Sequence, residues 1–233
     1  MAVVDTAAVA AGARVALVAG ATGLVGQAVL AALLADNHYA QVHTVGRRAL
    51  PWVHPKLMQH VVDFAAPAPW AGLPRIDDCF IAPGTTIKVA GSQAAFKAVD
   101  LEAVMAVART GLAQGATKLG VVSAMGADPK SSIFYNQVKG EMETAVAQLG
   151  FQTVVFARPA MLTGDREALN QPTRSGERIG LLVTRLLRPF IPANYQSVNA
   201  QDVAAALVHA VKTSKPGTTC LLSGALQGAA AVH

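Results

Sequence analysis

Tyr135 and Lys139 are four residues apart in a segment with helical spacing, so their side chains fall on one face of a helix. A free tyrosine hydroxyl has a pKa near 10 and is a poor acid–base group at neutral pH. A lysine ammonium a few ångströms away favours the phenolate and eases proton transfer. The pair therefore suits general acid–base chemistry, although two residues on a solvated helix face would show the same spacing.

Ser123 follows a short apolar segment and precedes Tyr135 by twelve positions. Ligands of doubly wound sheets bind at the carboxyl ends of the strands, which is where this serine is expected. Its hydroxyl could hold a substrate carbonyl beside the tyrosine, and an ordinary turn serine is the alternative. Together the three residues predict an acid–base site for a carbonyl or alcohol.

A second chemical signal is the glycine-rich turn that begins at Gly20 and also contains Gly23 and Gly26. It lies between a predicted strand at 14–20 and a predicted helix at 24–35. There, bare backbone can approach a pyrophosphate and the helix amino terminus can stabilise its charge. The alternative is a glycine-rich turn that serves only the packing of the helix on the strand. The position of the turn between a strand and a helix favours nucleotide binding.

The second predicted strand ends in Gly46-Arg47-Arg48, with two guanidiniums and no carboxylate. At this place an acidic residue would accept from the ribose of NAD, whereas arginines pair with the 2′-phosphate of NADP. The pattern predicts NADP(H), with a pair of solvated arginines as the alternative. Asp63 is placed to accept from the adenine amine or to serve as a turn residue, and Thr22 adds a hydroxyl near the phosphates.

The elements that position these residues alternate between short apolar strands and longer helices. This order predicts an α/β fold, a doubly wound parallel sheet (a Rossmann fold) with a small C-terminal substrate-side cover at 159–200. The periodicity weakens between 161 and 196, where the segment 181–190 could form a lid or a subunit contact. Strands are expected at 14–20, 41–46, 60–64, 78–82, 117–123, 151–157 and 218–222, and helices at 24–35, 92–111, 134–149 and 199–212.

Composition limits the class of protein. The chain has 233 residues, of which 52% are hydrophobic and 14% charged, which predicts one globular domain at 14–233 after a flexible leader at 1–13. The net charge of +5 comes from scattered residues, so no nucleic-acid partner is expected. The two cysteines and scattered histidines predict no disulfide framework and no metal site. No apolar run is long enough to span a membrane, so we expect a cytoplasmic protein without a membrane partner. It could form a homodimer.

In this chain order the glycine turn, Ser123 and the Tyr135–Lys139 pair resemble the short-chain dehydrogenase/reductase superfamily. Longer segments are similar to its atypical branch, which contains the Tat-interacting-protein oxidoreductases. The similarity extends from about residue 14 to residue 222. The segments that carry it are Val45–Arg48, Val61–Phe64, Pro83–Thr86, Ser123–Asp128 and Ser131–Glu141.

The resemblance implies an oxidoreductase that uses NADP(H), with Tyr135 as the acid–base residue, Lys139 on the nicotinamide ribose and Ser123 orienting the substrate oxygen. One group of residues would hold the adenosine and phosphate half: Gly20, Thr22, Gly23, Leu24, Val25, Gly26, Arg47, Arg48, Asp63 and Phe64. A second group would line the nicotinamide side: Ala82, Pro83, Gly84, Thr85, Lys139, Arg158, Pro159 and Met161.

The expected activity is hydride transfer from NADPH to a small carbonyl or quinone-like acceptor. Two departures from the branch concern the substrate: the turn Ala82–Thr85 replaces an asparagine-rich one, and Ala124 follows Ser123 where a second serine is usual. One alternative is an NADP(H)-sensing interaction protein with little catalysis. Another is a sugar-nucleotide epimerase or dehydratase, for which the region after Arg158 offers little room.

Overall fold

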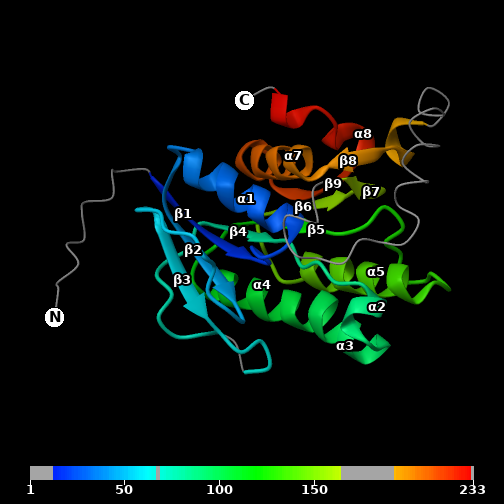
Figure 1. Ribbon diagram of the computed structural model, residues 1–233, viewed down its shortest axis with the longest axis horizontal. Coiled ribbons are helices and arrows are strands. Elements are labelled where there is room, and N and C mark those ends of the chain that lie inside the picture. Colours follow the sequence, from blue (N-terminus) through cyan, green and yellow to red (C-terminus); the bar gives the residue numbers. More distant parts are fainter. Residues whose placement is uncertain (1–12, 67–68, 164–191, 232–233) are drawn as a thin grey trace.

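A computed structural model of the chain describes residues 13–66, 69–163 and 192–231. Most of the leader predicted at 1–13 lies outside these residues, as does the 164–191 part of the predicted substrate-side region, including the segment 181–190. The remainder forms three layers, with helices on both faces of a central sheet (Figure 1).

The sheet has seven strands, all parallel, in the order β3-β2-β1-β4-β5-β6-β9. The order reverses between β1 and β4, so the loops that follow these two strands open on one crevice. The predicted α/β fold with a doubly wound parallel sheet is confirmed. The strands are β1 (Arg14–Ala19), β2 (Tyr39–Gly46), β3 (Leu57–Val61), β4 (Asp78–Ile81), β5 (Lys118–Val122), β6 (Thr153–Arg158) and β9 (Gly217–Leu222).

Helices cover both faces of the sheet because the central strands are apolar on both sides. In β1, Ala16 and Val18 pack into one core with α1 (Leu24–Ala35) and α7 (Ala200–Thr213). Leu17 and Ala19 face the opposite core, which α4 (Val104–Ala113) and α5 (Phe134–Ala147) close. Figure 1 shows α1 and α7 on one side of the sheet and α4 and α5 on the other.

The third strand begins and ends three residues earlier than the predicted range 60–64. Its register with β2 pairs Leu57 with Val42, and it ends at Val61. The chain then turns, because the Asp63 carboxylate accepts a hydrogen bond from the backbone N–H of Ala65 at 2.9 Å. The prediction was wrong here because the apolar run 60–64 continues into this turn.

The helix predicted at 92–111 is present but is not uniform. Ser92 caps it, accepting from the backbone N–H of Ala95 at 3.1 Å. The run consists of α3 (Gln93–Lys97), a π-helical turn η1 (Ala98–Ala103) and α4. A π-helical turn widens the helix locally, and such turns are frequent at functional sites.

The remaining elements are short. Two of them form a small parallel sheet of β7 (Met161–Thr163) and β8 (Ser197–Asn199) at the end of β6, where the sequence predicts the substrate-side cover. Within the described residues, no helix is both long and apolar enough to cross a bilayer, and no group of three or more metal-binding side chains is present. The other short helices are α2 (Ile87–Ala90), η4 (Ala193–Tyr195), α8 (Ser223–Leu226) and η5 (Ala229–Ala231).

Candidate functional site

The glycine turn connects β1 to α1 at the point where the strand order reverses. Gly20 has a φ of 83°, and a Cβ atom there would lie 2.1 Å from the carbonyl oxygen of Ala82. A Cβ atom on Gly26 would lie 2.0 Å from the carbonyl oxygen of Gly20. These two glycines are therefore needed for the turn itself, since only hydrogen atoms fit between the backbones.

Gly23 differs from the other two glycines. It is the N-cap residue of α1, with a φ of −90° that any residue adopts, and a Cβ atom there would lie 3.3 Å from its nearest neighbour, the carbonyl oxygen of Gly20. No side chain caps the helix, so the first-turn N–H groups are available to an anion. The geometry of the turn fits a pyrophosphate.

Alanine substitutions should separate the two roles of these glycines. Gly26→Ala forces two backbones apart, and we expect it to lower the melting temperature by about 5 °C or more. Gly23→Ala places a methyl group where a cofactor phosphate would approach, and we expect at least about tenfold weaker binding of a nicotinamide dinucleotide with a much smaller stability loss. Thermal unfolding followed by circular dichroism and a cofactor titration measure the two effects. Equal losses of stability would mean that Gly23, too, serves packing.

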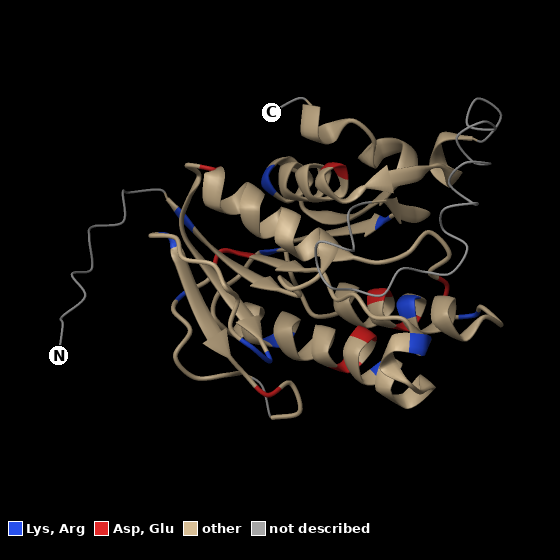
Figure 2. Cartoon of the chain, in the orientation of Figure 1, with Lys and Arg blue, Asp and Glu red and all other residues tan. Residues whose placement is uncertain are grey.

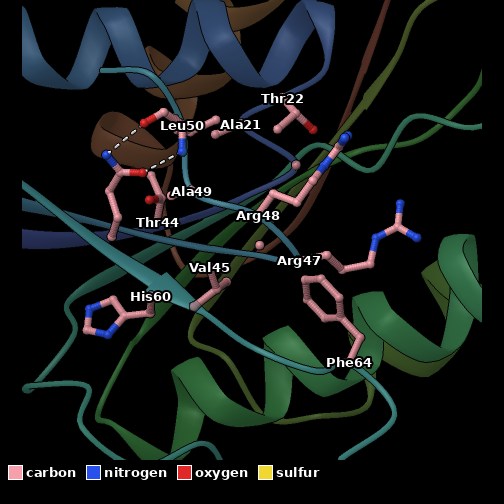
Figure 3. Close-up of a pocket in the computed structure, with 13 residues that line it drawn as sticks. Ala21, Thr22, Thr44, Val45, Arg47, Arg48, Ala49, Leu50, His60 and Phe64 are labelled. Carbon is pink, nitrogen blue, oxygen red and sulfur yellow. Dashed lines mark hydrogen bonds between the residues drawn. The ribbon is translucent and has the colours of Figure 1, made fainter. Parts of the chain in front are cut away.

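Arg47 and Arg48 follow β2 and line one pocket with Gly20 and Thr22 of the glycine turn (Figure 3). Both guanidiniums are exposed, and neither has an ion-pair partner among the described residues. Planar guanidiniums bind phosphate with two parallel hydrogen bonds. The pocket therefore supplies positive charge and hydrogen-bond donors beside the turn.

The backbone of this pocket is held by Gln59 of β3. Its side-chain oxygen accepts from the N–H of Leu50 at 2.6 Å, and its amide nitrogen donates to the carbonyls of Leu50 and Trp52 at 3.2 and 2.9 Å. Figure 3 marks the bonds to Leu50 with dashed lines. The loop that carries the two arginines is thus anchored by one partly buried amide network, which sequence analysis did not identify.

Two histidines lie behind the arginine pocket. His60 lines it, and a ring nitrogen of His60 is 2.9 Å from one of His43. Burial, together with the neighbouring His60, lowers the pKa of His43 to about 4, and burial also lowers the pKa of His60. Both rings are uncharged at neutral pH, so the positive charge of this pocket comes from the arginines.

An apolar cavity of about 260 Å³ adjoins the arginine pocket, and Gly20, Arg47 and Phe64 line both. Its remaining walls come from the ends of β1 and β4, from the loops after β3 and β4, and from η1 and α4. Such a cavity fits a flat aromatic base. Asp63 does not line it, and its carboxylate holds the turn to Ala65. The carboxylate thus serves the turn, and its contact with an adenine amine stays a prediction.

Ser123 lies directly after β5, as expected, and is 5% exposed. Its backbone N–H donates to the carbonyl of Ala157 at 2.7 Å, which fixes the residue at the end of the sheet. The Oγ atom is buried and has no hydrogen-bond partner within the described structure. A buried hydroxyl without a partner is costly, and a ligand oxygen would satisfy it.

Tyr135 and Lys139 lie on α5, one turn apart, as the spacing predicts. Tyr135 is half-buried, and its ring packs on the fully buried ring of Phe96, with centroids 5.3 Å apart. The Lys139 ammonium is buried and lies 2.6 Å from the Oδ1 atom of Asp100. Sequence analysis missed both partners, although the four-residue spacing of Phe96 and Asp100 within a predicted helix was a usable signal.

On the predicted nicotinamide side, Pro83 lines the apolar cavity and Met161 is exposed at the start of β7. The Arg158 guanidinium pairs with the Glu143 carboxylate of α5, which raises the pKa of this arginine. Its side chain is thus occupied within the protein. The backbone beyond it is fixed by hydrogen bonds from Met125 to the Pro159 carbonyl, and from the Ala160 N–H to the Ser223 hydroxyl.

The glycine turn, the arginine pocket and the apolar cavity meet at the carboxyl edge of the sheet, and together they fit the phosphates, the ribose and the base of a dinucleotide.

Solved structures of dinucleotide-binding proteins share this architecture. The chain superposes on a short-chain dehydrogenase/reductase oxidoreductase from Burkholderia thailandensis with a TM-score of 0.64 and 18% identity, covering 92% of each chain. It superposes on the Bordetella bronchiseptica enzyme WbmF in complex with NAD+ with a TM-score of 0.68 and 17% identity, covering 95% of this chain and 78% of that one. The fold is that of short-chain dehydrogenases/reductases.

Sequence comparison narrows this class. The chain is 30% identical over 214 residues to FMP52 of Coccidioides immitis, which covers 86% of this chain and 87% of the relative. It is 35% identical over 162 residues to HTATIP2 of Rattus norvegicus, covering 68% and 65% of the two chains. No protein-family model matches the sequence. The chain belongs to the atypical short-chain dehydrogenase/reductase family of FMP52 and HTATIP2, as the motifs indicate.

The same comparison contradicts the expected cytoplasmic location. The FMP52 relatives of Coccidioides immitis, Candida glabrata and Chaetomium globosum are named mitochondrial proteins. The expectation rested on unpaired cysteines and on the lack of a membrane-spanning run. Unpaired cysteines indicate a reducing environment and do not distinguish one such compartment from another.

Proposed function

We propose that this protein is an NADPH-dependent reductase that transfers hydride to a small carbonyl or quinone-like acceptor. The observation that carries the proposal is the buried, unpartnered Ser123 hydroxyl at the strand end that leads to Tyr135 and Lys139. The arginine pocket beside the glycine turn supports NADPH as the cofactor. We further propose a mitochondrial location, which the names of the FMP52 relatives support.

When bound, the cofactor supplies a hydride to the carbonyl carbon. Ser123 donates a hydrogen bond to the carbonyl oxygen and orients it. Tyr135 gives its hydroxyl proton to the same oxygen as negative charge develops there. The Lys139 ammonium stabilises the tyrosinate that remains and, by binding the nicotinamide ribose, keeps the cofactor beside the substrate.

Segments that adjoin the site residues along the chain carry apolar side chains, which favours a small, weakly polar acceptor. Ile133 is exposed at the start of α5, Met161 is exposed at β7, and the loop after β4 contributes Pro83 and Gly84. None of these side chains would pair with a charged substrate. The substrate class is thus inferred from the hydroxyls of Ser123 and Tyr135 and from the apolar side chains of the adjoining segments.

The first test is a titration of the purified protein with NADPH and NADH at one fixed salt concentration, followed by nicotinamide fluorescence. We expect NADPH to bind at least tenfold more tightly than NADH, a gap of about 1.4 kcal/mol. A panel of small carbonyls and quinones then tests turnover by the loss of NADPH absorbance. Binding without turnover on any acceptor would favour a cofactor-sensing protein, and binding of neither nucleotide would overturn the proposal.

A further inference from the structure

Two acidic residues lie in η1, and Figure 2 shows acidic positions in red on the helical run between α3 and α4. Asp100 is buried and contacts Lys139 of α5. Glu102 comes two positions later, and residues at this spacing do not share a helix face. Glu102 is exposed and lines the apolar cavity beside the arginine pocket. The helix thus presents one acid to α5 and the other to the cavity that fits the base.

Glu102 differs in chemistry from the rest of the cavity wall. Of the described residues that line this cavity, only Glu102 and Arg47 have a polar side chain. A guanidinium donates hydrogen bonds and accepts none, whereas a carboxylate accepts them. The Glu102 carboxylate has no ion-pair partner among the described residues. It is therefore the side chain of this wall that can accept a hydrogen bond from a ligand.

Several backbone carbonyls at the same wall are already bonded within the protein. The carbonyl of Ala19 accepts from the N–H of Ala82 at 2.9 Å, and the carbonyl of Gly20 accepts from the N–H of Gly23 at 2.9 Å. The wall residues of η1 and α4 belong to a continuous helical run, in which carbonyls bond to N–H groups further along the chain. These bonds leave the carboxylate as the stronger acceptor for a ligand.

A purine base offers a matching donor for this carboxylate. The exocyclic amine of adenine donates hydrogen bonds, whereas guanine has a carbonyl oxygen at the same position. A carboxylate attracts the amine and repels the carbonyl oxygen. The acceptor that the sequence predicts for this amine, Asp63, does not line the cavity, and its carboxylate accepts from the N–H of Ala65.

We propose that Glu102 selects adenine in this cavity, because its carboxylate accepts a hydrogen bond from the exocyclic amine of the base. This inference rests on the proposed function, since it takes the cavity to hold the base of the cofactor. The bound base shields the carboxylate from water, and a charge-assisted hydrogen bond is stronger in such surroundings. Glu102 is thus a determinant of base specificity, and it takes no part in the proton transfer.

The decisive test compares NADPH with reduced nicotinamide hypoxanthine dinucleotide phosphate, in which a carbonyl oxygen replaces the adenine amine. Both compounds carry the same fluorescent nicotinamide, so the same titration gives both Kd values. We expect the wild type to bind NADPH about tenfold or more tightly than the hypoxanthine analogue. In Glu102→Gln this ratio should fall to about threefold or less, because an amide accepts from the amine or donates to the carbonyl. Glu102 is exposed, so the variant should fold as the wild type does.

Two further variants make the test specific. Glu141→Gln is the matched control, because it makes the same change at a partly exposed acid of α5 that lines neither pocket. This variant should retain the wild-type ratio. Asp63→Asn should retain it too, since a weaker turn lowers the affinity for both nucleotides alike. The inference would be overturned by a wild-type ratio near one, by a full ratio in Glu102→Gln, or by loss of the ratio in Asp63→Asn.

A fragment of the cofactor separates this inference from the proposed function. Adenosine 2′,5′-bisphosphate contains the base and the 2′-phosphate but no nicotinamide, and inosine 2′,5′-bisphosphate is its hypoxanthine counterpart. Calorimetry should show the same preference for adenine in the wild type and its loss in Glu102→Gln. If the protein selects adenine in this way but reduces no acceptor, the role of Glu102 holds and the reductase function fails. An active reductase without the preference would overturn the role of Glu102 alone.

Discussion

Replacing Tyr135 by phenylalanine should lower the turnover of every accepted carbonyl by about 10² or more, because the substitution removes the proposed proton donor. The change deletes one oxygen and keeps the ring that packs on Phe96. We therefore expect the melting temperature and NADPH affinity to stay close to those of the wild type. The loss should appear in kcat, measured by steady-state NADPH oxidation with the best acceptor from the panel.

Tyr195→Phe is the matched control for this experiment. Tyr195 lies on η4, is 63% exposed, and belongs to none of the pockets that form the candidate site. The same loss of one hydroxyl should leave turnover unchanged there. Tyr39 is unsuitable, because its buried hydroxyl donates to Asp78 at 3.0 Å and burial raises its pKa. Unchanged turnover in Tyr135→Phe would exclude this tyrosine as the proton donor.

The elements that the sequence predicts well are those whose signals are local. Helix α1 begins and ends at the predicted residues, since Gly23 precedes a regular apolar face and Asp36 follows it. The side chain of Ser92 caps α3 and marks where this helix begins. Gly150 has a φ of 97°, which accounts for the end of α5 and the start of the next strand nearby. Each of these signals lies within a few residues of the boundary it sets.

The features that the sequence does not reveal depend on contacts between distant segments. Gln59 looks like one polar residue in a strand, and only the fold brings its amide to Leu50 and Trp52. Asp100 looks like an exposed residue on an amphipathic helix, but α5 buries it against Lys139. The chemistry of Tyr135 and Lys139 was predictable from spacing, whereas the groups that position them were not.

Removing both arginines of the pocket should change cofactor preference more than any single substitution outside the acid–base site. In Arg47→Ala/Arg48→Ala we expect NADPH to bind about 10²-fold more weakly, because two charge-assisted contacts with the 2′-phosphate are lost. NADH lacks that phosphate, so its affinity should change by less than about threefold. Parallel fluorescence titrations of both nucleotides measure the ratio directly.

The control for this double variant is Arg75→Ala. Arg75 is 82% exposed in its side chain and lies before β4, at the end of the sheet opposite the pocket. The Arg75→Ala substitution removes a surface guanidinium outside the arginine loop, so the affinities for NADPH and NADH should both be retained. The preference for NADPH should also weaken with added salt in the wild type and much less in the double variant, since exposed charges are screened. Equal losses for NADPH and NADH would mean that the arginines hold the loop or the shared pyrophosphate, and that the 2′-phosphate is read elsewhere.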